Sequence, residues 1–440
     1  MNEAQITTNI NLKNFVINNI FGNIGLNLFR LGILLLAAAP SISFLLLLIS
    51  SLGGIFNRDS KFSEDKYNWL LIFSSFLMIF NCIFLTFDFI EIPKLVKSLT
   101  WLGLLNWIPL FWCFWSFQKY LKTQKDRSVT AKIFIIGSIP VLISGFCQYF
   151  LKIYGPYRLF NNLIIWYQRP IGDDGSITGL FNNYNYAGAW LCIIFPLCLG
   201  FLLKKRKENF LKYINFGIVA SFVLMIVLTT SRSAILATLI SYLLLEKFSK
   251  IKFLVFFTSI LFTIFTLKIL LLFNFDILRY LNDFLPSGIL NKIATLNTLN
   301  INNFPRIDIW TKSISLINQN LLFGYGAGSF PSIYKLFNGN FDGIQHTHNI
   351  FLELAFNHGI IVAFLIFSTM VGILSSASKK YLFENDNQDL SLMDKAWIIS
   401  FVNFLIIHFF DITYFDGRIS ILSWSLLAGL RSITKNKIKI

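Results

Sequence analysis

Residues 186–203 read YAGAWLCIIFPLCLGFLL, a run of 18 residues without a charged side chain. A helix of about 20 mostly apolar residues is long enough to cross the hydrocarbon core of a bilayer. Four basic residues, KKRK at 204–207, follow the run directly. Because basic residues collect in the short cytoplasmic loops of membrane proteins, this stretch predicts a transmembrane helix that ends in the cytoplasm.

The whole chain has the same character. Its 440 residues are 55% hydrophobic and only 14% charged, whereas a soluble domain averages about 25% charged residues. The formal net charge of +16 fits cytoplasmic loops of a membrane protein better than a nucleic-acid surface. A soluble enzyme, a disordered chain and a nucleic-acid-binding module are therefore excluded. The lipid bilayer is the expected partner.

Apolar runs of similar length recur along the chain. They predict an all-α, polytopic membrane bundle of 11 or 12 spans, depending on whether Pro40 divides the first run into two short helices. That first run is expected to be a retained anchor and not a signal peptide, because a proline follows its alanines at 37–39. The expected spans are 31–56, 67–87, 98–117, 131–151, 186–203, 211–229, 232–246, 251–273, 347–373, 396–411 and 418–433.

The basic segments set the expected orientation. Segments 118–130 and 204–212 and the tail from residue 431 are rich in Lys and Arg, and counting helices places all three on one side. That side is predicted to be cytoplasmic, together with the C-terminus. The side of the N-terminus depends on the span count. The outer side then receives 152–185, the turn near residue 230, the long stretch 274–346 and the turn 411–417.

The long outer stretch is expected to be partly helical. Apolar residues recur there at steps of three and four, the period of an amphipathic helix, and Pro305 suits the first turn. Such a helix could lie on the outer surface of the bundle or cap a cavity. The apolar positions are Ile307, Trp310, Ile314, Ile317 and Leu321, and Gly324, Gly326 and Gly328 follow them. These glycines are not a nucleotide loop, because Ser329 occupies the place of the last glycine in that motif.

Two arginines on the outer side are candidate anion-binding residues. Arg232 lies in TTSRSAIL (229–236), at a turn between two spans. An arginine beside the hydrocarbon usually faces the protein interior or a wet cavity, although a snorkelling side chain is the alternative. Arg306 opens the amphipathic helix, and its planar guanidinium suits bidentate phosphate binding. A surface ion pair with Asp308 is the alternative there.

The segment QHTHN (345–349) opens another apolar run. Three of the four histidines of the chain fall within the 13 residues 346–358, and a neutral imidazole is the commonest general base. A metal pair of His346 and His348 is an alternative, although no third ligand has a recognisable spacing. Simple interfacial histidines are a second alternative. A catalytic base is therefore the favoured interpretation of this segment, and both alternatives stay open.

Weaker signals lie in two other outer segments. The stretch 179–188 puts Asn185 and Tyr186 at a helix start, which suits sugar hydroxyls but equally a capped helix with interfacial aromatics. Asp411, Asp416 and Arg418 flank the last outer turn and could pair with the arginines above or with each other. The five cysteines lie in apolar runs without a CxxC pair, so neither a disulfide framework nor a zinc site is indicated.

Together these segments resemble the O-antigen ligase family, integral-membrane glycosyltransferases that are also similar to O-antigen polymerases. The resemblance rests on Arg232 with Leu236 four positions later, on Arg306 before Trp310 and Gly-Tyr-Gly at 324–326, and on His348-Asn349 with Gly359 ten residues after Asn349. It covers 179–372, and one position of the last motif departs from the family by being Val362. It implies N-terminal transmembrane helices (1–178), a ligase-like core (179–373) that includes the outer loop 274–346, and C-terminal transmembrane helices (374–440).

The resemblance implies a reaction as well. A polysaccharide would pass, without metal or cofactor, from an undecaprenyl-pyrophosphate-linked donor to an acceptor hydroxyl on a glycolipid or glycan, at the periplasmic face of the bacterial inner membrane. His348 would be the general base, and Arg232 and Arg306 would hold the donor pyrophosphate. Substrate contacts would come from Asn349, Asn185, Tyr186, Gly324, Gly326 and His346.

Two other functions stay open at this point. A polymerase of the same superfamily would use another lipid-linked repeat as its acceptor, and the sequence does not separate it from a ligase. A transporter belongs to a different class and would place charged residues or broken helices near the middle of the membrane. Arg30 is the only charge well inside a possible span, if the first apolar run is counted from Phe15 onward, and Lys268 and His408 lie towards the outer ends of their spans. This pattern disfavours transport.

Overall fold

The computed structural model describes residues 23–53, 62–87, 94–171, 175–204, 209–245, 305–337, 339, 341, 343–383 and 392–435. These residues are mostly helical and confirm the expected all-α membrane bundle. Within them, six helices are long and apolar enough to cross a membrane: Lys66–Thr86, Gln124–Phe150, Tyr184–Leu203, Asn209–Leu228, Ile360–Lys379 and Leu392–Phe410.

Prolines divide three of the expected spans into shorter helices. The first apolar run forms Asn23–Leu35 and α2 (Pro40–Leu52). The expected single helix 98–117 is wrong, because the chain forms α4 (Lys94–Gly103), a short 3₁₀ turn η3 (Leu104–Asn106) and α5 (Ile108–Phe117). The run 131–151 is divided into α6 (Gln124–Gly137) and α7 (Ile139–Phe150). A proline occupies the first turn of each second helix, where its missing N–H is tolerated.

The expected spans 67–87, 186–203 and 211–229 are confirmed as α3 (Lys66–Thr86), α8 (Tyr184–Leu203) and α9 (Asn209–Leu228). The expected span 232–246 forms α10 (Arg232–Leu245), an apolar helix of 14 residues that is shorter than these candidate spans. Helix α8 is the most enclosed of them, because its residues from Ala187 to Phe201 are buried. It packs against α9, α10 and α18 (Leu392–Phe410). The expected span 251–273 and the beginning of the outer loop lie outside the described residues.

The amphipathic helix of the outer loop is confirmed as α14 (Pro305–Gln319), and only part of its apolar stripe is buried. The buried side chains are Ile309, Ser313, Leu316 and Ile317, whereas Ile307, Ile314 and Leu321 are exposed. The buried stripe is rotated because α14 packs against the short helix α16 (Ile350–His358). The exposed isoleucines thus leave an apolar face of α14 uncovered by the described residues.

The expected span 347–373 is divided as well, into α16 and α17 (Ile360–Phe383). Gly359 lies between them with a φ of +85°, and a Cβ at this position would clash with the carbonyl oxygen of Leu322. Glycine is the residue that adopts such a conformation without strain. The break turns the outer end of a long apolar run into a separate helix whose first turn follows His348. The helices α15 (Phe330–Leu336) and α19 (Gly417–Lys435) complete this half of the chain.

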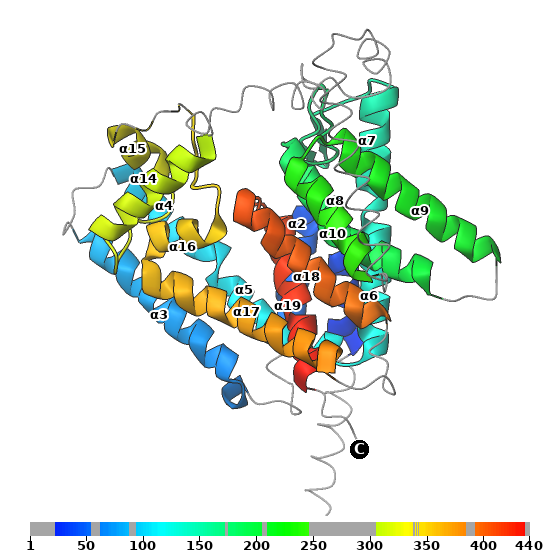
Figure 1. Ribbon diagram of the computed structural model, residues 1–440, viewed down its shortest axis with the longest axis horizontal. Helices are drawn as coiled ribbons and strands as arrows, with labels where there is room; N and C mark the ends of the chain where they lie inside the picture. The colour runs from blue at the N-terminus through cyan, green and yellow to red at the C-terminus, as the bar shows by residue number, and fades with distance from the viewer. Residues whose placement is uncertain are drawn as a thin grey trace, which may run out of the picture.

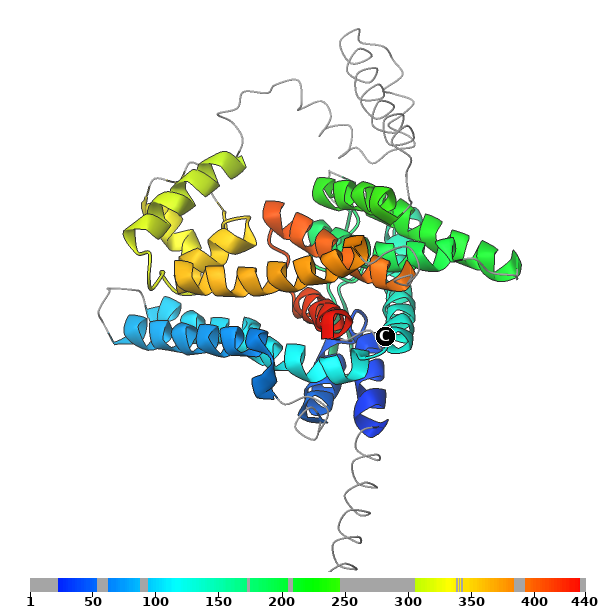
Figure 2. The same cartoon turned by 60° about the horizontal axis from the view of Figure 1, so that its bottom comes forward.

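The helices form two groups with α18 and α19 between them (Figure 1). One group contains α14, α15 and α16, with α4 beside them, and the other contains α8, α9 and α10. Turning the molecule shows α3 and α5 as a layer beneath α16 and α17 (Figure 2), in agreement with the packing of α3 on α17 and of α5 on α19. The C-terminal end of α18 therefore lies where the two groups meet.

A two-stranded antiparallel hairpin follows α7. Its strands are β1 (Tyr157–Leu159) and β2 (Ile164–Trp166), paired with Tyr157 opposite Trp166 and Leu159 opposite Ile164.

Candidate active site

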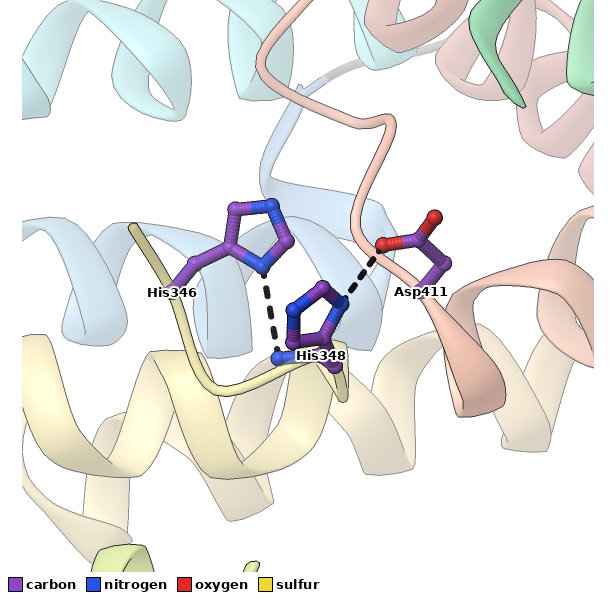
Figure 3. Close-up of side chains that lie close together, drawn as sticks. All are labelled: His346, His348 and Asp411. Atoms are coloured by element: carbon purple, nitrogen blue, oxygen red, sulfur yellow. Dashed lines mark hydrogen bonds and ion pairs between the residues drawn. The ribbon is translucent and has the colours of Figure 1, made fainter. Parts of the chain in front are cut away.

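His348 lies on the segment before α16, and its imidazole is paired with a carboxylate. Its Nδ1 is 2.9 Å from Oδ1 of Asp411, which follows α18 (Figure 3). Since an ionised carboxylate only accepts hydrogen bonds, the pair assigns the ring proton to Nδ1. The lone pair of Nε2 is then free to take a proton from a substrate.

The residues on either side of His348 are held by hydrogen bonds. The backbone N–H of Thr347 donates to Glu353 Oε2 over 3.0 Å, and the Thr347 hydroxyl donates to the Asn349 carbonyl over 2.9 Å. The Asn349 side chain accepts from two backbone N–H groups in the first turn of α16, which makes it the N-cap of this helix. Its Nδ2 donates to the Phe409 carbonyl at the end of α18 over 3.1 Å. The turn with His348, at a φ of +55°, is thereby tied to α18.

Asp411 is a candidate site residue whose contact with His348 the sequence did not reveal. Its Oδ1 also accepts from the backbone N–H of Ile412 at 2.8 Å, and its Oδ2 accepts from Asn185 Nδ2 of α8 at 2.8 Å. Burial acts to raise the pKa of the Asp411 carboxyl, but the hydrogen bond from His348 and the charges of His348 and His346 hold this pKa below its usual value. The carboxylate is therefore ionised at neutral pH. Its position at an outer helix end was the one signal in the sequence.

The two candidate arginines lie near this carboxylate. Arg306, at the start of α14, is half-buried, and Arg232, the first residue of α10, is exposed. Burial lowers the pKa of the Arg306 guanidinium, the negative charge of Asp411 opposes this effect, and the positive charge of Arg232 adds to it. Arg306 is therefore within electrostatic range of both residues. The structure thus relates Arg306 by charge to both Asp411 and Arg232, and relates Asp411 to His348 by a hydrogen bond.

Asp308, the alternative partner considered for Arg306, is engaged with another residue. Its Oδ2 accepts a hydrogen bond of 2.6 Å from the Tyr334 hydroxyl of α15. This contact joins α14 to α15 and supports the outer helix on which Arg306 lies.

His346 lies beside His348, with 4.4 Å between the ring centroids (Figure 3). Its Nδ1 accepts from the backbone N–H of His348 at 3.3 Å. Burial, with a further contribution from the charge of His348, lowers the pKa of His346 to about 4, so this ring is neutral at pH 7. One ligand atom each of His346, His348 and Asp411 lie within 4.8 Å of one another. This is a chemically suitable donor set for a transition metal, and its third ligand was missing from the sequence pattern.

The predicted substrate-binding residues fall into two places. Asn185 bonds to Asp411, Tyr186 lies within electrostatic range of the same carboxylate, and Asn349 caps α16. Gly324 and Gly326 instead pack at the C-terminal end of α16, where the Gly326 N–H donates to the Asn357 carbonyl over 3.1 Å. A substrate contact of either glycine stays a prediction.

The acidic and basic residues of the last outer turn pair with each other. Arg418 Nη2 is 2.5 Å from Asp416 Oδ2, and its guanidinium lies 3.7 Å above the ring of Phe181. The contact of Arg418 with Phe181 joins α19 to the segment before α8. Asp411 instead pairs with His348. All five cysteines are free, in agreement with the expectation that there is no disulfide framework.

Comparison with protein families gives an independent result. Residues 216–367 match the family described as O-antigen ligase, and no curated protein matches the chain. The matched range contains Arg232, Arg306, the glycine segment and His348-Asn349, which carried the resemblance in the sequence. The domain at residues 216–367 is therefore identified as similar to the O-antigen ligase family.

Proposed function

We propose that this protein transfers a glycan from an undecaprenyl-pyrophosphate-linked donor to an acceptor hydroxyl. The observation that carries the proposal is the 2.9 Å pair of His348 Nδ1 and Asp411 Oδ1. Arg306 is in electrostatic range of Asp411 and of the second arginine, Arg232. A base beside two fixed positive charges matches a reaction that deprotonates an alcohol and expels an anion.

The transfer step follows from these roles. The acceptor oxygen attacks the anomeric carbon of the donor sugar, and its proton passes to His348 Nε2. The bond from that carbon to the pyrophosphate oxygen breaks, and its electron pair leaves with the undecaprenyl pyrophosphate. Asp411 keeps the imidazole oriented and stabilises the imidazolium that forms, as a carboxylate does in a Ser-His-Asp triad. Asp411 is thus a positioning residue, and His348 is the catalytic base.

Arg232 and Arg306 bind the pyrophosphate of the donor in this proposal. A planar guanidinium binds phosphate oxygens through paired, charge-assisted hydrogen bonds. Arg232 and Arg306 repel each other in the free protein, and a bound pyrophosphate would relieve this repulsion. Since the pyrophosphate is already a good leaving group, two arginines neutralise its charge without a metal. We therefore propose metal-independent catalysis, in which His346 stays a neutral neighbour and not a metal ligand.

The proposed setting is the bacterial inner membrane, with the C-terminus in the cytoplasm and the site facing the periplasm. This orientation is supported by the basic segments 118–130 and 204–212 and the basic tail, which collect on one side. The same count of helices puts the segments that carry the site residues on the periplasmic side.

Ligase-type transfer to a glycolipid or glycan is the leading form of the proposal. A polymerase of the same superfamily performs the same chemistry on a lipid-linked acceptor, so the nature of the acceptor separates the two. The family match supports glycan transfer in either form and lends no support to a transporter.

The test is glycan transfer by the purified protein with a defined undecaprenyl-pyrophosphate-linked donor, with and without EDTA. Equal transfer under both conditions is expected. Transfer that needs added metal would refute metal independence, and the absence of transfer to every hydroxyl acceptor would refute the function. A product that keeps the donor glycan length on a new carrier identifies a ligase, whereas a longer lipid-linked glycan identifies a polymerase.

A further inference from the structure

The hairpin after α7 presents an apolar tip to its surroundings. The tip, 160–163, connects β1 to β2, and the side chains of Phe160 and Leu163 are 75% and 48% exposed. Phe160 has a φ of +51°, a conformation that is rare for bulky residues. Exposure of this large apolar side chain to water is energetically unfavourable, and nothing in the hairpin itself buries it. Such outliers tend to occur where a contact requires them.

The base of the hairpin is fixed to the bundle. Trp166 Nε1 donates to the Ala38 carbonyl over 2.7 Å. Gln148 of α7 donates to the Arg169 carbonyl over 2.5 Å and accepts from the Thr178 N–H at 2.9 Å. The tip is therefore held outward on a rigid support and does not fold back onto the protein.

The apolar surface of the hairpin continues the exposed apolar surface of a candidate membrane span. Helix α7 is the second half of the candidate span Gln124–Phe150. Its exposed apolar residues recur at steps of four, three and four and so form one stripe, which leads into exposed apolar residues of the segment before β1. They are Ile139, Ile143, Phe146, Phe150, Leu151, Ile153 and Tyr154. The hairpin begins where this exposed apolar stripe ends, just beyond the C-terminal end of the candidate span.

The basic residues of the hairpin also indicate contact with a lipid bilayer. Lys152 and Arg158 are exposed beside the apolar side chains. Apolar groups with adjacent basic residues are typical of segments that lie in the interface of a bilayer, where long basic side chains reach the lipid phosphates.

We infer that the hairpin 157–166 is a membrane-interface anchor, with Phe160 and Leu163 among the acyl chains of a phospholipid leaflet and Arg158 at the phosphates. The partner is the lipid bilayer itself. The segment after the hairpin reaches the turn before Arg232, because the Ile177 N–H donates to the Leu228 carbonyl over 3.1 Å and the Ser176 and Thr230 hydroxyls are 2.5 Å apart. If the proposed function holds, the anchor fixes the height of Arg232 relative to the phosphates of a lipid-linked donor.

The direct test is the depth of the tip in liposomes. Phe160→Cys, in a Cys147→Ser background, is labelled with bimane in the full-length protein and compared with Gln345→Cys, an exposed position beside His346. The label at 160 is expected to be quenched by nitroxide-labelled phospholipid and protected from aqueous iodide, with the reverse at 345. Iodide quenching without lipid quenching at 160 would overturn the inference, and protection from both quenchers would do so too, since another protein surface would then cover the tip.

A second test links the anchor to the reaction. Phe160→Asp combined with Leu163→Asp is compared with Asn161→Asp, which adds charge at a polar position of the same tip. Aspartate tolerates the positive φ at 160, so the fold of the hairpin is kept. The double variant is expected to raise KM for a lipid-linked donor in liposomes about tenfold with little change in kcat, and the control is expected to leave KM unchanged. An equal KM in all three proteins would contradict the link to Arg232, whereas a wild-type protein without transfer activity would refute the proposed function and leave the quenching result to decide the anchor.

Discussion

His348 and Asp411 determine which imidazole nitrogen can act as a base. The carboxylate accepts a hydrogen bond from Nδ1 at 2.9 Å, so the lone pair that faces a substrate belongs to Nε2. An amide at position 411 could donate as well as accept, and it would stabilise the wrong tautomer.

Asp411→Asn is therefore expected to lower kcat about 10²- to 10³-fold, in the range of general acid–base contributions, with little change in KM for the donor. Asn at this position keeps the size of the side chain, so the protein should unfold at a similar temperature. Steady-state kinetics of glycan transfer measure the effect. A large rise in KM with unchanged kcat would show that Asp411 serves donor binding instead of orienting His348.

His346 gives the protein a dependence on pH. Its pKa is about 4 in the folded state, and an unfolded histidine titrates near 6.5. Between these values the unfolded state binds more protons, so the free energy of unfolding rises with pH and falls as the solution is acidified from pH 7 to pH 5. In wild-type protein the melting temperature should fall by a few degrees over this interval.

His346→Asn removes this titration, and a flatter dependence of melting temperature on pH is expected. Thermal unfolding in detergent at several pH values measures it. An unchanged slope in the variant would mean that His346 is not buried in neutral form. Its transfer activity should be reduced less than that of His348→Ala, because His346 is a neighbour of the base and not the base itself.

Helix α16 places His348, and a single side chain secures its start. Asn349 accepts from two backbone N–H groups of the first turn and donates to the Phe409 carbonyl. Loss of an N-cap destabilises a protein by about 1 kcal/mol, and here the link to α18 is lost in addition.

Asn349→Ala is expected to destabilise the fold by about 1–2 kcal/mol and to increase hydrogen exchange across 347–358. Asn349→Asp is the matched control, since it keeps the capping oxygen but loses the donor to Phe409. An intermediate melting temperature is expected for it. Equal melting temperatures for the alanine variant and the wild type would contradict the capping role.

The sequence predicted long helices better than the points where they break. Unbroken apolar runs such as 186–203 were found as single helices because their length and composition allow little else. The breaks at Pro109 and Gly359 depend on local backbone conformation, which hydropathy does not encode. The arginines and His348 were selected as candidates by their rarity beside the membrane. Asp411 was missed as the partner of His348, because the two residues are 63 positions apart and the sequence gives no sign of their contact. The buried face of α14 was missed for the same reason, since packing against α16 determines it.

At the scale of the whole molecule, an ion pair joins the N-terminal and C-terminal helices. Arg127 of α6 donates to both oxygens of Asp394 in α18, at 2.7 and 2.8 Å, and both side chains are buried. Helix α18 carries Asp394 at one end, and Asp411 follows its other end. A shift of α18 would therefore move Asp411 relative to His348.

Asp394→Leu is expected to destabilise the protein by about 3–5 kcal/mol, because it leaves the Arg127 guanidinium buried without its counter-charge. Arg127→Met combined with Asp394→Leu should recover most of that loss, since neither charge then remains. Thermal unfolding of the purified variants measures both. A double variant no more stable than the single one would show that the pair contributes through packing and not through charge.

The proposed reaction requires Arg232, Arg306 and His348 to act at one centre. Their single alanine variants can be tested together, with donor binding and glycan transfer measured separately on purified protein. The His348→Ala variant is expected to bind the undecaprenyl-pyrophosphate-linked donor like the wild type but to transfer the glycan about 10²- to 10⁴-fold more slowly. Both arginine variants are expected to lose donor affinity and glycan transfer. Transfer at the wild-type rate by any one of the three would contradict the shared centre.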